Sequence, residues 1–479
     1  MATPAPAVAV PPPAEDAAAT PPAAPADAFE TSTLLDVSFD SILMYIPEEI
    51  SHSLDYIMAM GQGLDADKEY TATLDVVHSD PNSHLYSAVS FEELNLPENL
   101  LKGVYALKFS KPSKIQTVAL PMILTEPPEN LIGQAQSGSG KTATFVLGML
   151  YRATKDTTKQ VQSLCLAPTR ELARQIMAVV TIMGSFCGVE TFLAIPGNEV
   201  EKGQTITAQI VVGTPGRVES LIKKRTLDLR NLKIFVLDEA DVMIDESGMR
   251  DRSLAIKKTI KNPSCQILLF SATYADEVRE FAEKMVVNPN IITVKKERLS
   301  LDEIKQFWID CVTHDKKYEI LSDIFSLLNV GKSVIFVQAR ETAKKLTAFL
   351  REKGHSVGIL HGADMAKEVR DQVLDDFRLG TTKVLITTNV LARGIDVLGV
   401  TLVVNFDIPV NRDGHPDPET YLHRIGRTGR FGRKGAAINF VYDKKSKMDL
   451  AYIENHYEKK IEEAPADDLE ALEKLLSWT

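Results

Sequence analysis

A glycine-rich segment at residues 135–142, Ala-Gln-Ser-Gly-Ser-Gly-Lys-Thr, carries the residue types that bind phosphate groups. Gly138 and Gly140 allow the backbone to turn closely around an anion and to point several N–H groups at it. Lys141 can neutralise charge on β- and γ-phosphates, and Thr142 can offer its hydroxyl to Mg²⁺. An apolar stretch precedes the segment and a helix-like run follows it. This order predicts a phosphate-binding loop between a strand and a helix.

An acidic tetrad, Asp238-Glu239-Ala240-Asp241, directly follows the apolar run Ile234–Leu237. Ligands of parallel α/β sheets bind at the carboxyl ends of the strands. We therefore expect Asp238 to be the carboxylate on the Mg²⁺ side, and Glu239 to orient and deprotonate an attacking water. Alone, such a tetrad would be read as a solvated loop, but its place after a buried strand and downstream of a phosphate loop favours catalysis.

Charge is distributed unevenly along the 479 residues. The chain has 54 Lys+Arg against 65 Asp+Glu, a net charge of −11. Residues 1–67 contain eleven acids and no base, which leaves 54 acids and 54 bases in residues 68–479. This part of the chain is neutral overall and creates no strong basic field. Nucleic acid would therefore have to bind in a local groove.

Cysteine usage and hydropathy place the protein in a reducing intracellular compartment. The four cysteines lie far apart and form no Cys-x-x-Cys pair, which argues against a disulfide framework and a zinc ribbon. No uncharged apolar run approaches the roughly 20 residues that span a bilayer. No Lys or Arg occurs before Lys68, so a basic signal or transit peptide is not expected.

Four segments follow from the composition along the chain. Residues 1–89 form an acidic extension, whose Pro- and Ala-rich part at 1–27 we predict to be disordered. Its residues 41–60 show mostly helical apolar spacing, which fits either a helix packed on the neighbouring domain or a regulatory element. Beyond it we expect a first domain at 90–295, a linker at 296–303 and a second domain at 304–479.

Both domains alternate short apolar runs with amphipathic helices, which predicts doubly wound α/β sheets. Runs rich in Val, Ile and Leu indicate parallel strands that are buried on both faces. The expected strands are Ser163–Ala167, Ile210–Val212, Ile234–Leu237, Gln266–Phe270, Ser333–Val337, Ser356–Leu360, Val384–Thr387 and Leu402–Val404.

In order and spacing, a set of short motifs resembles the DEAD-box ATP-dependent RNA helicases over about residues 90–445. These motifs are Phe109–Gln116, the phosphate loop, Pro168–Ala173, Thr214–Arg217, the tetrad, Ser271–Thr273, Val334–Val337, His361-Gly362, Thr387–Asp396 and His423–Arg430. The resemblance implies two tandem RecA-like domains, ATP and Mg²⁺ as ligands, and RNA-dependent ATP hydrolysis.

The resemblance also assigns nucleotide contacts. Gln116 would pair with the adenine edge and Phe109 would stack on the ring. Arg427 and Arg430 would reach the γ-phosphate as arginine fingers, with His423 ordering the site. Asp396 would hold the ribose hydroxyls. The other expected nucleotide-binding residues are Gln136, Ser137, Gly138, Ser139, Gly140, Lys141, Thr142, Asp238 and Gly394.

Further roles by resemblance concern RNA. Its backbone would be held by Pro168, Thr169, Arg170, Gly216, Arg217, Gly362 and Thr388. Ser271 and Thr273 would couple the state of the nucleotide to RNA binding. The alternative for Arg424, Arg427, Arg430 and Arg433 is a solvated basic stretch. Two positions depart from the family: Ala194–Gly197 stands where many relatives have a Gly-Gly pair that contacts the RNA backbone, and Asn389 replaces a common Asp and receives no role.

Three features resemble the DEAD-box helicases of mRNA export: the segment Asp80–Phe91, the acidic extension, and the long connection Val410–Thr420. This closer resemblance implies a nucleoporin propeller and an inositol-hexakisphosphate-dependent export activator as partners. It also implies a monomer in nucleus and cytoplasm, enriched at the cytoplasmic face of the nuclear pore, without membrane contact. A translation-initiation helicase and an ATP-gated RNA clamp are the alternatives. Residues 41–60 are a candidate autoinhibitory segment.

Overall fold

The computed structural model describes residues 74–78, 87–135, 138–201, 203–245, 248–294, 304–327, 331–361, 365–389, 399–411, 413–429, 435–466 and 474–475. All structural statements below concern these residues. The helix expected within 41–60 and the linker expected at 296–303 lie outside them, as does most of Asp80–Phe91.

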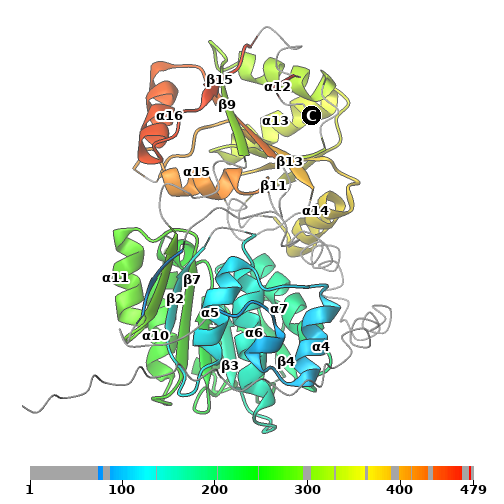
Figure 1. The fold of residues 1–479 in the computed structure, drawn as a ribbon. Coiled ribbons are helices and arrows are strands. Elements are labelled where there is room, and N and C mark those ends of the chain that lie inside the picture. Colours follow the sequence, from blue (N-terminus) through cyan, green and yellow to red (C-terminus); the bar gives the residue numbers. More distant parts are fainter. Residues whose placement is uncertain are drawn as a thin grey trace, which may run out of the picture. The chain divides into compact units, whose positions relative to one another are not determined.

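The strands before residue 295 form an eight-stranded sheet, which we call the first lobe (Figure 1). Its strand order is β1-β8-β2-β7-β6-β3-β5-β4. All neighbours are parallel except β1, which pairs antiparallel with β8. The strands are β1 (Leu74–Val77), β2 (Leu131–Gln134), β3 (Ser163–Leu166), β4 (Thr191–Ala194), β5 (Ile210–Gly213), β6 (Ile234–Leu237), β7 (Gln266–Ser271) and β8 (Asn290–Val294).

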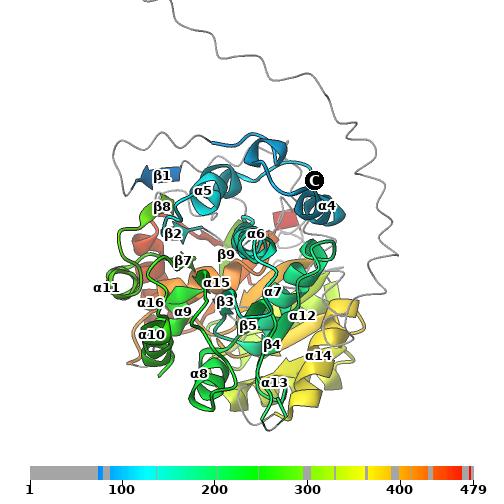
Figure 2. The ribbon, with the colours of Figure 1, turned by 90° about the horizontal axis from the view of Figure 1, so that it is seen from below.

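Helices cover both faces of this sheet, and a separate hydrophobic core lies on each face. Figures 1 and 2 show the two groups of helices on opposite sides of the strands. One group consists of α4 (Glu98–Ala106), α5 (Lys114–Leu124), α6 (Lys141–Thr154) and α7 (Arg170–Met183). The other consists of α8 (Pro215–Lys223), α9 (Ala240–Asp245), α10 (Met249–Thr259) and α11 (Asp276–Met285).

The strands after residue 303 form a second, wholly parallel sheet, the second lobe, in the order β11-β12-β10-β13-β14-β9-β15. Its strands are β9 (Ile304–Asp310), β10 (Lys332–Phe336), β11 (Val357–Leu360), β12 (Val384–Thr387), β13 (Val400–Asn405), β14 (Gly435–Val441) and β15 (Glu462–Glu463). One face packs against α12 (Lys316–Leu327) and α13 (Arg340–Glu352), and the other against α14 (Lys367–Leu379), α15 (Pro418–Ile425) and α16 (Lys444–His456).

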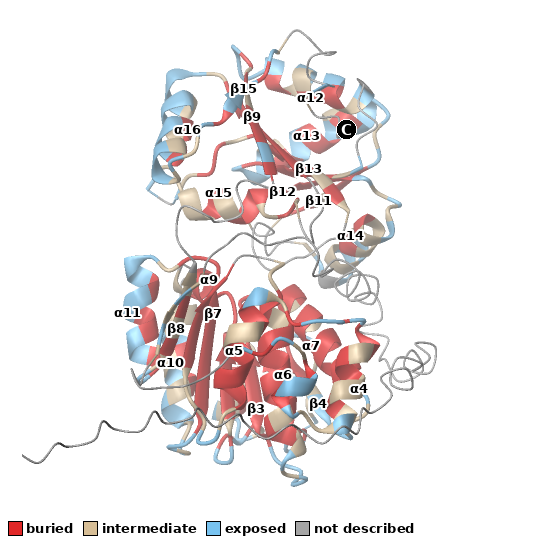
Figure 3. Ribbon diagram, viewed as in Figure 1, coloured by how far each residue is buried: buried red, intermediate tan, exposed pale blue. Residues whose placement is uncertain are grey.

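This architecture confirms the prediction of two tandem doubly wound α/β sheets. The predicted strands Ile234–Leu237 and Val384–Thr387 coincide with β6 and β12, and both are buried along their whole length (Figure 3). Among the described residues, no helix is long and apolar enough to cross a bilayer. The four cysteines are free thiols, and burial raises the pKa of Cys265 and of Cys311 to about 12.

Local sequence signals begin the helices that carry site residues. Thr169 caps α7, because its side chain accepts a hydrogen bond from the N–H of Leu172. Asp417 caps α15 in the same way, and Pro418 occupies the first helical position, where its missing N–H costs nothing. The first turns of both helices are thereby fixed next to the carboxyl ends of the strands.

Candidate functional site

The phosphate loop connects β2 to α6, as the sequence predicts. Gly138 has φ 80° and Gly140 has φ 98°, in the left-handed region that side chains disfavour. A Cβ atom at Gly140 would lie 2.9 Å from the Ser113 hydroxyl and 3.0 Å from the Gln116 amide nitrogen. The loop therefore requires glycine there both for its backbone and for space. The predicted contacts Gln136 and Ser137 lie outside the described residues.

The segment predicted to recognise adenine contacts this loop directly. Gln116, on the first turn of α5, donates from Nε2 to the carbonyl oxygen of Gly140 at 3.3 Å. Its Oε1 accepts from the N–H of Ser113, the N-cap residue of α5, at 2.8 Å. Phe109 is buried in the core of the first lobe. Its stacking on a base stays a prediction.

Several polar atoms around the loop are buried without a hydrogen-bond partner among the described residues. They are Lys141 Nζ, Ser139 Oγ, Ser113 Oγ and Glu239 Oε2. Buried polar groups, and ammonium groups above all, are normally paired in folded proteins. A buried ammonium beside an open glycine turn and a nearby carboxylate fits a phosphate chain with a bound cation.

The acidic tetrad lies at the carboxyl end of β6, and its first carboxylate is electrostatically perturbed. Burial, reinforced by the negative charge of Glu239, raises the pKa of Asp238 to about 7, while the positive charge of Lys141 opposes the shift. The Asp238 carboxylate accepts from the N–H of Glu239 at 3.0 Å. Glu239 has φ 51°, a strained conformation for a non-glycine residue. Such strain and burial are typical of functional sites.

The last residue of the tetrad, Asp241, is the centre of the polar contacts. Its Oδ2 accepts from the N–H of Thr273 at 3.2 Å and from the Thr273 hydroxyl at 3.0 Å. Its own N–H donates to Ser271 Oγ at 3.4 Å. The same Oδ2 lies 3.1 Å from Nε2 of His423 in the second lobe. Ligand atoms of Glu239, Asp241 and His423 all lie within 4.8 Å of one another. Asp241 was recognised in the sequence as part of the tetrad, but no role was predicted for it.

In the second lobe, α15 carries the predicted histidine and precedes one predicted arginine finger. His423 and Arg427 are both buried, and Arg427 Nε donates to the carbonyl oxygen of His423 at 3.0 Å. Arg424 is fully buried, which excludes the alternative of a solvated stretch for Arg424 and Arg427. Burial lowers the pKa of Arg424 to about 9, so its guanidinium stays charged at neutral pH.

Other second-lobe residues expected at the site fall outside the described residues. These are Gly362, Gly394, Asp396, Arg430 and Arg433. Thr388, which is described, is buried directly after β12.

The residues expected to hold RNA in the first lobe lie at the starts of α7 and α8. Pro168 is buried, and Thr169 uses its hydroxyl in the helix cap. Gly216 lies in the first turn of α8, where a Cβ atom would approach Arg252 Nη1 to 2.7 Å. Arg217 donates to the carbonyl oxygen of Asn198 at 2.7 Å and pairs with Glu199 at 3.1 Å.

Ion pairs link the start of α7 to α14 of the second lobe. Arg170 and Arg174 lie 3.3 and 3.0 Å from the Asp371 carboxylate. Glu171, which is buried, lies 3.0 Å from Arg370 Nε, close enough for an ion pair although the orientation does not meet hydrogen-bond geometry. No sequence pattern points to Arg370 or Asp371, because α14 carries charged residues all along its length and none stands apart.

Two family models match the chain, one in each lobe. The DEAD/DEAH box helicase model matches residues 113–281, and the helicase conserved C-terminal domain model matches residues 316–432. The chain belongs to the DEAD-box family of ATP-dependent RNA helicases, and it is an RNA-dependent ATPase and helicase.

Among individual proteins, the chain is 51% identical over 400 residues to the ATP-dependent RNA helicase dbp5 of Schizosaccharomyces pombe. The matched residues make up 84% of this chain and 79% of that protein. It is similar to the structure of S. cerevisiae Dbp5 bound to RNA and ADP BeF3, with TM-score 0.77, 48% identity, and coverage of 81% of this chain and 99% of that one. It is also similar to a Dbp5 variant bound to Nup159, a Gle1 variant, IP6 and ADP, with TM-score 0.60, 45% identity, and coverage of 80% and 98%.

Proposed function

We propose that this helicase uses ATP-driven closure of its two domains, at 90–295 and 304–479, to bend RNA during mRNA export. The observation that carries the coupling is the position of Asp241. One carboxylate oxygen contacts both Thr273 and His423. Thr273 belongs to the predicted coupling motif, and His423 begins the motif His423–Arg430 of the second lobe. A change in the tetrad is thereby transmitted to both motifs.

In the first lobe, Gln116 reads the adenine edge and Phe109 stacks on the ring. The phosphate loop, from Gln136 to Thr142, wraps the phosphates, and the ammonium of Lys141 finds there the partner that it lacks among the described residues. Thr142 and Asp238 would hold Mg²⁺, which would supply charge neutralisation for the phosphate chain.

Hydrolysis requires a base for the attacking water and positive charge for the γ-phosphate. Glu239 orients the water and accepts its proton through a buried carboxylate oxygen that has no protein partner among the described residues. Arg427 and Arg430 stabilise charge on the γ-phosphoryl oxygens, and His423 holds α15, which precedes Arg427, against Asp241. Gly394 and Asp396 complete the nucleotide site at the ribose.

RNA follows a track that both lobes share. Pro168, Thr169, Arg170, Gly216 and Arg217 hold phosphates on the first lobe, and Gly362 and Thr388 hold them on the second. Contacts to phosphates and 2′-hydroxyls give little sequence preference. A strand bent along this track cannot stay in a duplex or keep a bound protein, so short duplexes melt and proteins leave the RNA. Release of phosphate reopens the track.

The similarity to Dbp5 structures with Nup159, Gle1 and IP6 supports a role at the nuclear pore. We propose a nucleoporin propeller and an activator that uses inositol hexakisphosphate as partners, with enrichment at the cytoplasmic face of the pore and shuttling between nucleus and cytoplasm. Within the connection Val410–Thr420, the Asn411 side chain accepts from the N–H groups of Asp413 and His415, both at 3.0 Å.

Steady-state ATP hydrolysis with and without single-stranded RNA tests the proposal. Strong stimulation by RNA is expected from a site that both lobes complete. Tight RNA binding with ATP but without stimulation would instead favour an ATP-gated clamp. Addition of the export activator with inositol hexakisphosphate separates an export helicase, which should be stimulated further, from a translation-initiation helicase, which should not.

A deletion of residues 1–68 tests regulation by residues 41–60. If that segment restrains the enzyme, basal hydrolysis rises in the shortened protein. Unchanged basal and RNA-stimulated rates would remove the autoinhibitory role.

A further inference from the structure

A lysine is buried in the second lobe beside Asp407, which contacts α15. Lys317 lies in the first turn of α12, and its side chain is only 1% exposed. Its Nζ lies 2.7 Å from Oδ1 of Asp407 and stands over the rings of Phe406 and Tyr442, at 4.2 and 5.1 Å from their centroids. Burying an ammonium is costly unless it is paired, so this position serves a purpose that an apolar side chain would not.

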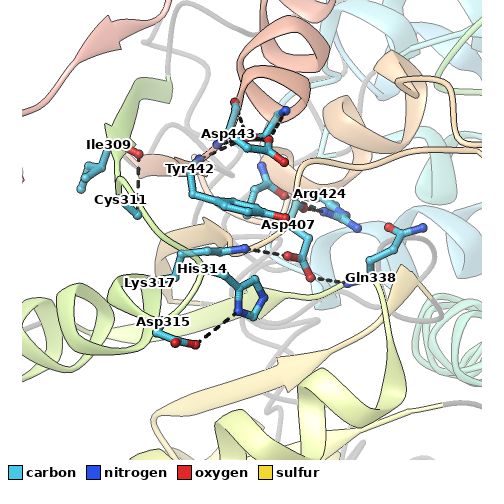
Figure 4. A network of polar contacts seen from close by, with 12 residues as sticks. Ile309, Cys311, His314, Asp315, Lys317, Gln338, Asp407, Arg424, Tyr442 and Asp443 are labelled. Atoms are coloured by element: carbon cyan, nitrogen blue, oxygen red, sulfur yellow. Dashed lines mark hydrogen bonds and ion pairs between the residues drawn. The ribbon is translucent and has the colours of Figure 1, made fainter.

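Asp407 connects three other elements of the lobe (Figure 4). It follows β13, and its second carboxylate oxygen accepts from the N–H of Gln338, just after β10, at 2.9 Å. Its backbone carbonyl accepts from Arg424 Nη1 of α15 at 2.8 Å. Lys317 therefore holds the residue that joins the end of β10, the end of β13 and α15.

Arg424 extends these contacts to the neighbouring strands. Its Nη1 also donates to Asn405 Oδ1 at 3.0 Å, and its Nε donates to Asn389 Oδ1 at 3.1 Å, just after β12. Asn405 Nδ2 in turn donates to Asn439 Oδ1 at 2.9 Å. The guanidinium thus makes four hydrogen bonds, all to neutral oxygen acceptors, and a displacement of Arg424 would break them.

The same helix is anchored at a second point. The hydroxyl of Tyr421 donates to Gln306 Oε1 of β9 at 2.8 Å and accepts from Asn439 Nδ2 at 3.2 Å. Tyr421 and Arg424 lie three residues apart and thus on one face of α15, with His423 between them. The buried polar chain therefore fixes the rotation of the helix that presents His423 to Asp241.

Electrostatics explain why Lys317 must be positively charged. The Asp407 carboxylate contacts Lys317, whereas Arg424 contacts only the Asp407 carbonyl. Without the ammonium, the uncompensated carboxylate would attract the Arg424 guanidinium, which already interacts with it through space. Arg424 would then leave Asn389 and Asn405, and α15 would turn.

We propose that Lys317 is a positioning residue for ATP hydrolysis, which acts through Asp407 to hold Arg424 and α15 in the arrangement required for turnover. The inference rests on the proposed roles of His423 and Arg427. It predicts an effect on kcat rather than on the KM for ATP, because the adenine contacts and the phosphate loop lie in the first lobe, whereas Arg427 of the second lobe is assigned to charge that develops on the γ-phosphate during hydrolysis.

RNA-stimulated ATP hydrolysis of the full chain tests this role with K317M, K317R and K316M. The K317M variant should lose about 10- to 100-fold in kcat, the scale that a small displacement of catalytic groups costs, with an unchanged KM for ATP. The K317R variant keeps the charge and should recover most of the activity. Lys316 is exposed on the same helix, so K316M should behave as the wild type.

Thermal unfolding of each variant shows whether it folds. The double variant K317M/D407N is included because K317M alone leaves the Asp407 carboxylate without its ammonium partner and could unfold the lobe. The double variant removes both charges of the Lys317–Asp407 pair, and the amide oxygen that D407N introduces can still accept from the N–H of Gln338. The double variant has no carboxylate to attract Arg424, so the proposal expects reduced kcat for folded K317M and recovery of most of that kcat for K317M/D407N. Wild-type kcat for K317M, or a folded double variant as impaired as K317M, overturns it.

R427A distinguishes failure of this inference from failure of the proposed function. Wild-type kcat for R427A would refute the proposed role of Arg427. If R427A loses activity while K317M does not, only the role of Lys317 fails.

Discussion

Asn389 and Arg424 are hydrogen-bonded partners: the side-chain oxygen of Asn389 accepts from both Nε and Nη2 of the guanidinium. Arg424 is fully buried, so it depends on such acceptors to balance its charge. The asparagine that departs from the family pattern thus receives a structural role that its sequence position did not reveal.

Replacing Asn389 with Ala should destabilise the second lobe. The guanidinium would lose a fork of two hydrogen bonds, at a cost of about 1–3 kcal/mol. N389D should retain or increase stability, because a carboxylate accepts the same fork with opposite charge. Thermal unfolding compares the two. Equal midpoints for N389A and the wild type would show that the contact contributes nothing.

Glu239→Gln should abolish turnover without loss of ATP binding. Gln keeps the size of the side chain but cannot accept the proton of the attacking water, and general-base catalysis contributes roughly 10²- to 10⁴-fold in rate. Steady-state hydrolysis and fluorescent-nucleotide titration measure the two properties. Hydrolysis near the wild-type rate would remove Glu239 from the base role.

Gly140→Ala should weaken nucleotide binding. The left-handed backbone costs a non-glycine residue about 1–2 kcal/mol, and the new methyl group would press on Ser113 and Gln116. The affinity for ATP should fall by about tenfold for each 1.4 kcal/mol. G188A is the matched control, since Gly188 also has a positive φ but has nothing within 4 Å of the added atom. Equal ATP affinities for the two variants would contradict the steric argument.

The Asp156–Lys233 pair should make stability depend on acid pH. Its atoms lie 2.8 Å apart, and hydrogen bonds from Lys233 and from the Thr158 backbone lower the pKa of Asp156 to about 2. Because the folded-state pKa lies below the unfolded value, the contribution is present above about pH 4 and is lost as the pH falls toward 2.

Since both side chains are about one third exposed, D156N should cost only about 0.2–1 kcal/mol at neutral pH. Thermal midpoints of D156N and the wild type should converge between pH 4 and 2. A gap that persists unchanged at pH 2 would argue against the ion pair as its origin.

Sequence predicts this fold best where burial is uniform. The runs Ile234–Leu237 and Val384–Thr387 were located to the residue because both faces of these central strands are covered. Edge strands carry a weaker signal: β1 alternates between half-buried and exposed positions, and β4 begins exposed. Neither was predicted as a strand, since each lies at a border of the sheet and its exposed positions interrupt the apolar pattern.

The residues of the site also differ in how well the sequence predicts them. The phosphate loop and the tetrad were predictable because consecutive residues carry them between a strand and a helix. The role of Asp241 was not, because Thr273 and His423 approach it from distant segments. Lys317 was invisible for a similar reason: two adjacent lysines begin α12, and only the fold shows that one is exposed and the other buried.

Strand β1 also has a consequence for how the protein behaves outside its native context. It pairs with β8 from Leu74↔Val294 to Val77↔Ile291, and so covers the backbone groups at that border of the sheet. A deletion that ends at residue 68 leaves this strand in place, whereas one that ends at residue 89 removes it. The longer deletion would expose a row of unpaired N–H and C=O groups, a template for association with other chains. Self-association and poor solubility are therefore expected of the protein that lacks residues 1–89, irrespective of its catalytic state.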